Sequence, residues 1–243
     1  MGFSIKKQSL DKQAAAGIRH QILNGEFGSG FRLVETWLAE QFGLSRGTIR
    51  AALSELAHEG LVTQIAYTRW VVTEISGDDI WELFTLRSAL EGLGARLAAQ
   101  MITPDSSKLL SAAYKRLVNA SVGKDRVAVT EADFGLHKLI IDLSEHRRLG
   151  EQYRLIEQQV RLVIASSNAL LPTINDIIGQ HEPIVKAILA GNATNSERLV
   201  RYHNLTEGKV LADHVRALAK PALFAVPEPE LVKSTKLGRK KKK

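Results

Sequence analysis

The sequence predicts a mainly α-helical protein, with an N-terminal winged helix-turn-helix domain followed by an all-α antiparallel helical bundle. Two observations predict this fold. Residues 9–74 show three short helical patterns and then two β-branched runs, which is the element order of a winged helix. Residues 77–220 repeat apolar side chains at helical spacing between short breaks, which is typical of a bundle.

Three helices are predicted in the N-terminal part. The first has apolar residues at four-residue spacing: Leu10, Ala14, Ile18 and Ile22. Gly25 follows and is placed to stop it. The second is predicted over 35–42 and ends at Gly43, and the third over 46–58 with Ser45 as its N-cap.

A short β-hairpin is predicted after these helices. Gly60 is the glycine expected beyond the third helix. The β-branched runs 61–65 and 70–73 then form the two strands, joined through 66–69. The segment Ser76-Gly77-Asp78-Asp79 breaks the pattern, so the first domain is predicted to cover residues 1–76.

The rest of the chain is predicted to be helical up to about Lys220. Six helices are expected, near residues 79–100, 106–122, 126–143, 148–168, 174–190 and 194–219. Residues 77–220 therefore form the predicted second domain. Residues 221–243 contain three prolines and end in Arg-Lys-Lys-Lys-Lys, so we expect a disordered basic tail.

Composition excludes several classes of protein. The 243 residues are 44% apolar and 24% charged, as in soluble globular proteins. No apolar run is long enough to span a bilayer, and the N-terminus lacks the apolar core of a secretory signal. The absence of cysteine excludes disulfides and thiol catalysis. We expect a cytoplasmic protein that makes no membrane contact.

The positive charge is unevenly distributed. The formal net charge is +7, and residues 221–243 alone carry 7 Lys and Arg against 2 Asp and Glu. The two predicted domains are nearly neutral, so net charge alone does not identify a nucleic-acid-binding protein. The positions of individual arginines matter more.

The third predicted helix carries arginines suited to DNA. Four-residue spacing places Arg46 and Arg50 on one face at its N-terminal end, where recognition helices meet bases and phosphates. Ser45, Thr48 and the amides of the first turn suit phosphate. Contacts to guanine and to phosphate both stay open, and the simpler alternative is an amphipathic helix with solvated arginines.

A second group of residues has metal-ligand chemistry. Asp133 and His137 are one helical turn apart, and His181 and His203 lie in two later helices. Bundles often build metal sites from facing helices, and these residue types suit Zn²⁺ or a similar ion. The alternative is that the histidines are solvated or satisfied in the core, as expected for the other four in the sequence.

Residues 24–62 resemble the N-terminal domain of the GntR family of bacterial transcription regulators. The likeness rests on glycines before Arg32-Leu33, on Leu44-Ser45-Arg46, on Ile49-Arg50 and on Glu59-Gly60-Leu61-Val62. It implies that operator DNA is bound by Arg32, Ser45, Arg46, Thr48, Arg50 and Arg69. The family usually has glycine after the wing arginine, whereas this chain has Trp70. We therefore expect Trp70 to pack against its own domain.

Residues 80–215 are similar to the helical FCD effector domain of the FadR subfamily. The likeness rests on Arg87-Ser88-Ala89-Leu90-Glu91 and on the Asp133, His137, His181 and His203 positions; Leu136 replaces a common phenylalanine. It implies a divalent metal held by those four residues, Zn²⁺ or Ni²⁺ before Mn²⁺, and a small carboxylate effector held by the metal. Arg87 or Arg161 can add a charge-assisted bond to that acid, although an ion pair of Arg87 with Glu91 is the simpler role.

These features together predict a ligand-responsive regulator, most simply a repressor, that binds a palindromic operator as a homodimer. One alternative is a metal-dependent enzyme with a DNA-binding appendage, but the sequence offers no further carboxylate spaced as a general base, no nucleophile elbow and no phosphate loop. We therefore expect no enzyme activity. Another alternative is a non-specific nucleic-acid binder driven by the basic tail.

Overall fold

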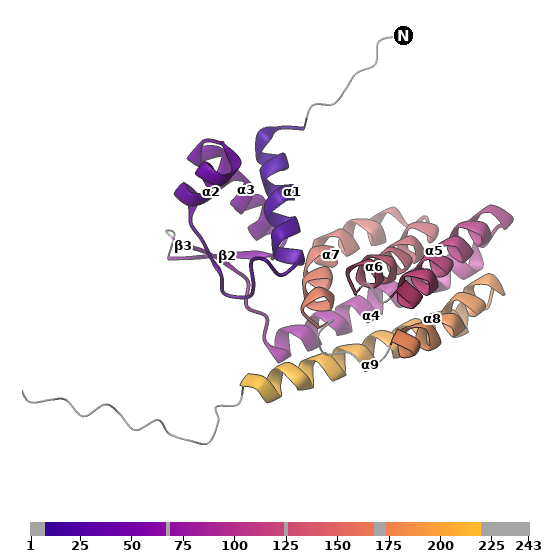
Figure 1. Cartoon of the computed structure of the whole chain (residues 1–243). Helices are drawn as coiled ribbons and strands as arrows, with labels where there is room; N and C mark the ends of the chain where they lie inside the picture. The colour runs from indigo at the N-terminus through magenta and orange to yellow at the C-terminus, as the bar shows by residue number, and fades with distance from the viewer. Residues whose placement is uncertain (1–7, 67–68, 124–125, 168–173, 220–243) are drawn as a thin grey trace, which may run out of the picture.

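The computed structural model describes residues 8–66, 69–123, 126–167 and 174–219. Helices dominate this part, with a small three-stranded sheet near the N-terminus, as the sequence predicts. Two groups of elements lie side by side: the N-terminal unit, α1 to β3, and the helical unit, α4 to α9 (Figure 1). Within the described ranges, no helix is long and apolar enough to cross a membrane. The predicted tail, residues 221–243, lies outside them.

The N-terminal unit has the predicted helices and hairpin. Its elements are α1 (Leu10–Leu23), β1 (Arg32–Leu33), α2 (Glu35–Phe42), α3 (Arg46–His58), β2 (Val62–Ile65) and β3 (Arg69–Val72). The strand order is β1-β3-β2, and both pairings are antiparallel. The sequence analysis missed β1, because two residues are too few to show an alternating pattern.

Local signals explain why α3 begins where it does. Gly43 ends α2 with a positive φ of 64°, a conformation that costs glycine little. Ser45 is the N-cap of α3, and its Oγ accepts a hydrogen bond from the Thr48 amide at 3.1 Å, as predicted. The short turn therefore leaves the first residues of α3 at the surface.

The core of the N-terminal unit also receives a side chain from the helical unit. Ile49 and Leu53 of α3 are fully buried there, and Trp70 is only 4% exposed. The expectation that Trp70 packs against its own domain is thus confirmed. Leu162 comes from α7 in the other unit, yet it belongs to this same core. The two units are therefore packed together.

The helical unit closely follows the prediction. It comprises α4 (Gly77–Gln100), α5 (Pro104–Gly123), α6 (Arg126–Leu143), α7 (Arg147–Ser167), α8 (Ile174–Leu189) and α9 (Ala193–Ala219). The predicted break at Ser76 is a helix start. The Ser76 Oγ accepts from the Asp79 amide at 3.1 Å, and the Asp79 carboxylate accepts from the Ser76 amide at 2.9 Å.

Helices α4 and α9 run along each other over much of their length (Figure 1). Their close approach depends on glycine. A Cβ at Gly208 of α9 would overlap the side chain of Phe84, and one at Gly77 of α4 would lie 2.6 Å from the Ala212 carbonyl oxygen. Both helices carry residues of the candidate site described below, so this packing positions it.

We expect Gly208→Ala to destabilise the protein. The added methyl would force the buried Phe84 ring to move, and overpacking of this kind costs about 1–3 kcal/mol. Urea unfolding measures the change. Gly150→Ala is the matched control, because a Cβ at Gly150 meets nothing within 4 Å. Equal unfolding free energies for the two variants would show that the α4–α9 contact tolerates a side chain.

Candidate metal centre and nucleic-acid interface

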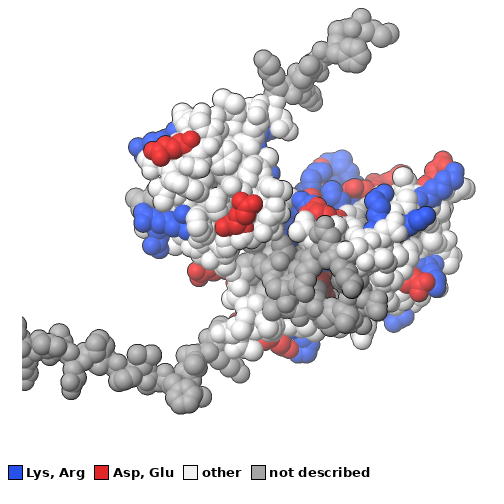
Figure 2. All heavy atoms as spheres, viewed as in Figure 1, with Lys and Arg blue, Asp and Glu red and all other residues white. Residues whose placement is uncertain are grey.

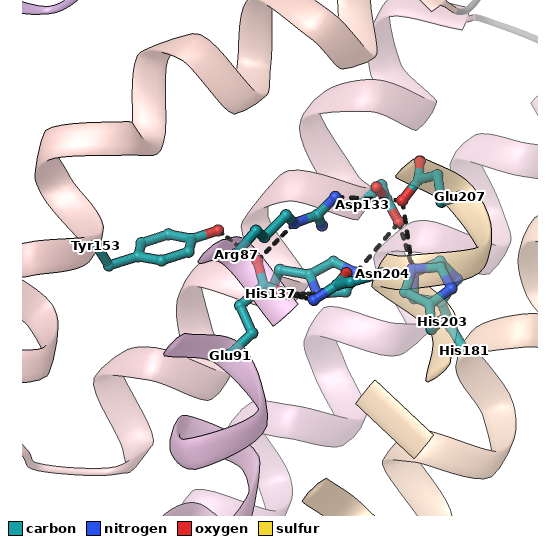
Figure 3. A network of polar contacts seen from close by, with 9 residues as sticks. All are labelled: Arg87, Glu91, Asp133, His137, Tyr153, His181, His203, Asn204 and Glu207. Carbon is teal, nitrogen blue, oxygen red and sulfur yellow. Dashed lines mark hydrogen bonds and ion pairs between the residues drawn. The ribbon is translucent and has the colours of Figure 1, made fainter. Parts of the chain in front are cut away.

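Four buried side chains from three helices meet inside the helical unit (Figure 3). Helix α6 supplies Asp133 and His137, α8 supplies His181, and α9 supplies His203. Each of the four is at most 7% exposed. The histidine ligand nitrogens all lie within 4.8 Å of one another. The fold thus brings together all four residues that the sequence analysis proposed as ligands.

The distances between the ligand atoms suit the binding of one shared metal ion. The Nε2 atoms of His137 and His181 are 3.0 Å apart, and Asp133 Oδ1 lies 2.7 Å from His181 Nε2. Two nitrogens that each bind a metal at about 2.1 Å, with angles between tetrahedral and octahedral, are roughly 3.0–3.4 Å apart. The observed nitrogen separation is at the short end of that range.

His203 gives the clearest sign that a group belongs here. Within the described part of the chain, neither of its ring nitrogens has a hydrogen-bond partner, although the side chain is 7% exposed. A buried polar atom without a partner is costly. Burial and the neighbouring His181 and His137 lower the pKa of His203 well below its ordinary value. The ring is therefore neutral and able to ligate a cation, so the residues present fit a metal.

Glu91 of α4 lies beside His137 at the edge of the cluster (Figure 3). One of its oxygens lies 2.7 Å from His137 Nδ1 and accepts a hydrogen bond from Asn204 at 2.8 Å. The other accepts from the Tyr153 hydroxyl at 2.7 Å and from Arg87 Nε at 2.8 Å. Burial would raise the pKa of Glu91, but Arg87 and His137 hold it well below its ordinary value. Glu91 is therefore a carboxylate.

This carboxylate orients His137. Because Nδ1 lies 2.7 Å from Glu91, a proton on that nitrogen would face the carboxylate and leave the lone pair of Nε2 for the other ligands, as in many metal centres in which an outer carboxylate fixes a histidine. The sequence analysis saw Glu91 only as a partner for Arg87. It missed Tyr153 and Asn204, whose positions carry no local signal. Glu207 follows His203 by four residues, so helical spacing could have indicated it.

The two arginines predicted to bind an effector have different surroundings. Arg87 is fully buried; its Nε contacts Glu91 at 2.8 Å and its Nη1 contacts Glu207 at 3.2 Å. The predicted ion pair with Glu91 is thus confirmed. Arg87 Nη2 has no hydrogen-bond partner among the described residues, so an effector role stays a prediction.

Arg161 of α7 lies outside the network drawn in Figure 3. It pairs with Glu131 of α6, and its guanidinium carbon sits 4.5 Å from the centroid of the Phe134 ring. Arg161 also lines a cleft between the two units together with Arg19 and His20 of α1. An effector contact of Arg161 stays a prediction. Its contacts with Glu131 and Phe134 give it a structural role.

The candidate DNA-reading residues lie at the surface of the N-terminal unit. Arg46 and Arg50 side chains are 64% and 58% exposed. Figure 2 shows Lys and Arg gathered at the outer edge of this unit, away from the helical unit. Arg32 on β1 and Arg69 on β3 are exposed, and Ser45 and Thr48 lie at the start of α3. All six predicted residues are thus at or near the surface.

Glu35 of α2 is a partner that the sequence analysis did not assign. Its carboxylate accepts two hydrogen bonds from Arg50, at 2.7 and 2.9 Å, and one from Trp70 Nε1 at 3.1 Å. The Arg50 guanidinium, opposed by partial burial, lowers the pKa of Glu35. Arg50 is thus held by the protein, whereas Arg46 is 3.8 Å from Glu35 and freer to reach DNA.

The neutral state of His203 predicts a pH dependence of stability. The pKa of His203 is lowered on folding, so the unfolded chain takes up a proton below about pH 6.5 while the folded chain does not. Stability is therefore retained above this pH and lost as pH falls, by up to about 1.4 kcal/mol per pH unit. Urea unfolding in chelator at about pH 7 and pH 5.5 measures it. A His203→Asn variant should show a flatter dependence; an unchanged slope would contradict the assignment.

An exposed arginine-bearing helix joined to a buried histidine cluster is the arrangement expected of a DNA-binding regulator with a sensing unit. Residues 10–72 match the family described as bacterial regulatory proteins, gntR family, and residues 82–206 match the FCD domain. The chain therefore belongs to the GntR family of bacterial transcription regulators and carries an FCD effector domain.

Two curated relatives agree with this assignment, and a solved structure has a similar fold. The probable D-xylose utilization operon transcriptional repressor of Paenarthrobacter nicotinovorans is 26% identical over 199 residues, 82% of this chain and 87% of that protein. The HTH-type transcriptional regulator Rv0494 of Mycobacterium tuberculosis is 31% identical over 168 residues, 62% and 68% of the two chains. Escherichia coli McbR/YncC has a similar fold, with a TM-score of 0.73 at 19% identity over 86% of this chain and 99% of that one. Both curated relatives are described as transcriptional regulators.

Proposed function

We propose that this protein is a ligand-responsive repressor. In this proposal residues 1–76 read a palindromic operator, and residues 77–220 bind the effector and join two copies of the chain. The observation that carries it is the buried cluster of His137, His181 and His203, in a chain that also presents an exposed arginine-bearing helix. Among the described residues, neither ring nitrogen of His203 has a hydrogen-bond partner.

The proposed centre would hold a divalent transition metal through Asp133, His137, His181 and His203. Imidazole ligands favour Zn²⁺ or Ni²⁺ over Mn²⁺. A bound ion would supply positive charge that attracts an anion. The buried guanidinium of Arg87 adds a donor suited to a carboxylate, because its Nη2 has no hydrogen-bond partner in the part of the chain that the structure describes. A small carboxylic acid is therefore the proposed effector class.

Helix α7 offers a physical link between effector and DNA. Near its start, Tyr153 donates a hydrogen bond to Glu91 in the buried network at 2.7 Å. Farther along, Gln159 occupies the space that a Cβ at Gly60 would need, and Leu162 enters the N-terminal core. Because Gly60 lies two residues beyond the end of α3, movement of α7 would shift the reading helix.

The proposed dimer gives the operator its symmetry. Two reading helices must lie about 34 Å apart, one helical turn of DNA, to enter successive major grooves. Light scattering in solution should therefore give about twice the 26.8 kDa chain mass. A change in the separation of the two reading helices would lower operator affinity and release the repressed genes.

Selection of bound sequences from random duplex DNA tests the proposed function. We expect inverted half-sites whose centres are about 10 bp apart. A chain shortened to residues 1–220 should select the same sequences. Enrichment without a palindrome, or loss of all preference on removal of residues 221–243, would instead favour non-specific binding through the basic tail.

A further inference from the structure

A cavity of about 250 Å³ lies at the junction of the N-terminal and helical units. We call it the junction cavity. The N-terminal unit contributes Ile22, Phe27 and the exposed loop that contains Gly28 and Ser29. The helical unit contributes residues of α4, α7 and α9, among them Ile80, Leu162 and Val215. This space is separate from the polar network around the histidines.

The lining of the junction cavity defines the chemistry of its occupant. Its side chains are aliphatic or aromatic apart from Ser29 and Thr73, and none is charged. The Thr73 hydroxyl already contacts the Thr63 hydroxyl at 3.1 Å. Burial of a charged ligand against such a surface would be costly. The occupant must therefore be neutral and largely apolar, with at most one or two polar atoms at the Ser29 rim.

The volume sets the size of this occupant. An apolar cavity of about 150 Å³ in another protein binds benzene and otherwise stays dry. Scaling by volume, the 250 Å³ junction cavity accommodates roughly ten non-hydrogen atoms, the size of a fused bicyclic ring. Protein interiors are otherwise closely packed, so filling this space would restore lost contacts.

The junction cavity lies where a ligand would contact the hydrophobic cores of both units. Ile75, in the segment joining the two units, packs against the hydrophobic cores of both and also lines the cavity. Leu162 lines it from α7 while it belongs to the N-terminal core. A ligand there would contact both cores at once and stabilise this arrangement of the two units. Binding sites often lie at such domain junctions.

We propose that the junction cavity is a binding site for a neutral, apolar small molecule of about bicyclic size, distinct from the candidate metal centre. The site does not depend on the proposed metal function. It is a second place at which a ligand can act on the orientation of the reading helix.

Indole is a suitable probe, and methyl NMR of the full chain labelled at Ile, Leu and Val reports where it binds. We expect saturable shifts at Ile22, Ile75, Ile80 and Leu162. Val215→Phe projects a larger ring from the cavity lining and should weaken indole binding at least 10-fold. Val210→Phe is the matched control, because Val210 lies on the same helix and is 51% exposed.

Each outcome bears on the proposal. No shift at the lining methyls up to the solubility of indole, or equal affinities for the two valine variants, would overturn it. If Val215→Phe fails to fold, Ile75→Phe replaces it. If neither variant folds, the methyl shifts of the unaltered chain decide. Binding should persist in chelator and in His203→Ala. Loss of binding in His203→Ala would place the probe at the histidines and refute a separate site.

Discussion

Arg46→Ala is expected to weaken operator binding strongly while the protein stays folded. Arg46 is 64% exposed at the start of α3, so its removal disturbs no core. A specific arginine contact to a base contributes about 1–3 kcal/mol, and a dimer would lose it at both half-sites. The affinity for the selected duplex should fall by roughly 30-fold to more than 10,000-fold. Fluorescence anisotropy at fixed salt measures it.

Arg198→Ala is the matched control for this change. Arg198 is an exposed arginine on α9 of the helical unit, so its loss changes the net charge equally without touching the reading helix. Only a small effect on DNA affinity is expected. If the two variants bind the duplex equally well, α3 is not the recognition helix. The hydrogen bonds that tie Arg50 to Glu35 make Arg46 the cleaner test.

His203→Ala is expected to remove the stabilisation that metal gives to the protein. Changes even to outer-shell residues cost about 10–100-fold in metal affinity, and loss of a direct ligand should cost more. At a free metal concentration 100 times the dissociation constant, the unaltered chain gains about 2.7 kcal/mol. The variant should gain less than about 0.5 kcal/mol at the same concentration. Chemical unfolding with Zn²⁺ and with chelator measures both.

His214→Ala is the control on the same helix. His214 lies on α9 like His203 but outside the cluster, and its replacement should leave the metal effect intact. Asp133→Asn offers a second ligand variant if His203→Ala does not fold. Equal stabilisation of His203→Ala and the unaltered chain by Zn²⁺ would show that the cluster is a packing feature.

Much of the fold is predictable because local signals agree with packing. Gly43 and Ser45 stop α2 and start α3 at the predicted residues, since a positive φ and a side-chain cap are local properties. The strand β1 could not be predicted. It exists only because Arg32 and Leu33 pair with β3, a contact between segments far apart in the sequence.

The candidate site was only partly predictable for the same reason. Helical spacing alone places Asp133 beside His137, and the family likeness indicated His181 and His203. The Glu91 carboxylate approaches His137 from another helix, and the Tyr153 hydroxyl of a third helix donates a hydrogen bond to that carboxylate. No spacing in the sequence reports such contacts, so the residues that orient the ligands emerged only from the fold.

The central claim is that Asp133, His137, His181 and His203 hold one metal ion. Elemental analysis of the purified, untagged protein tests it most directly, before chelation and after Zn²⁺, Ni²⁺ and Mn²⁺ are each offered. We expect about one transition-metal ion per chain, as a single four-residue site requires. A chain that carries no metal and takes up none of the three ions would contradict the metal centre and the effector proposal built on it.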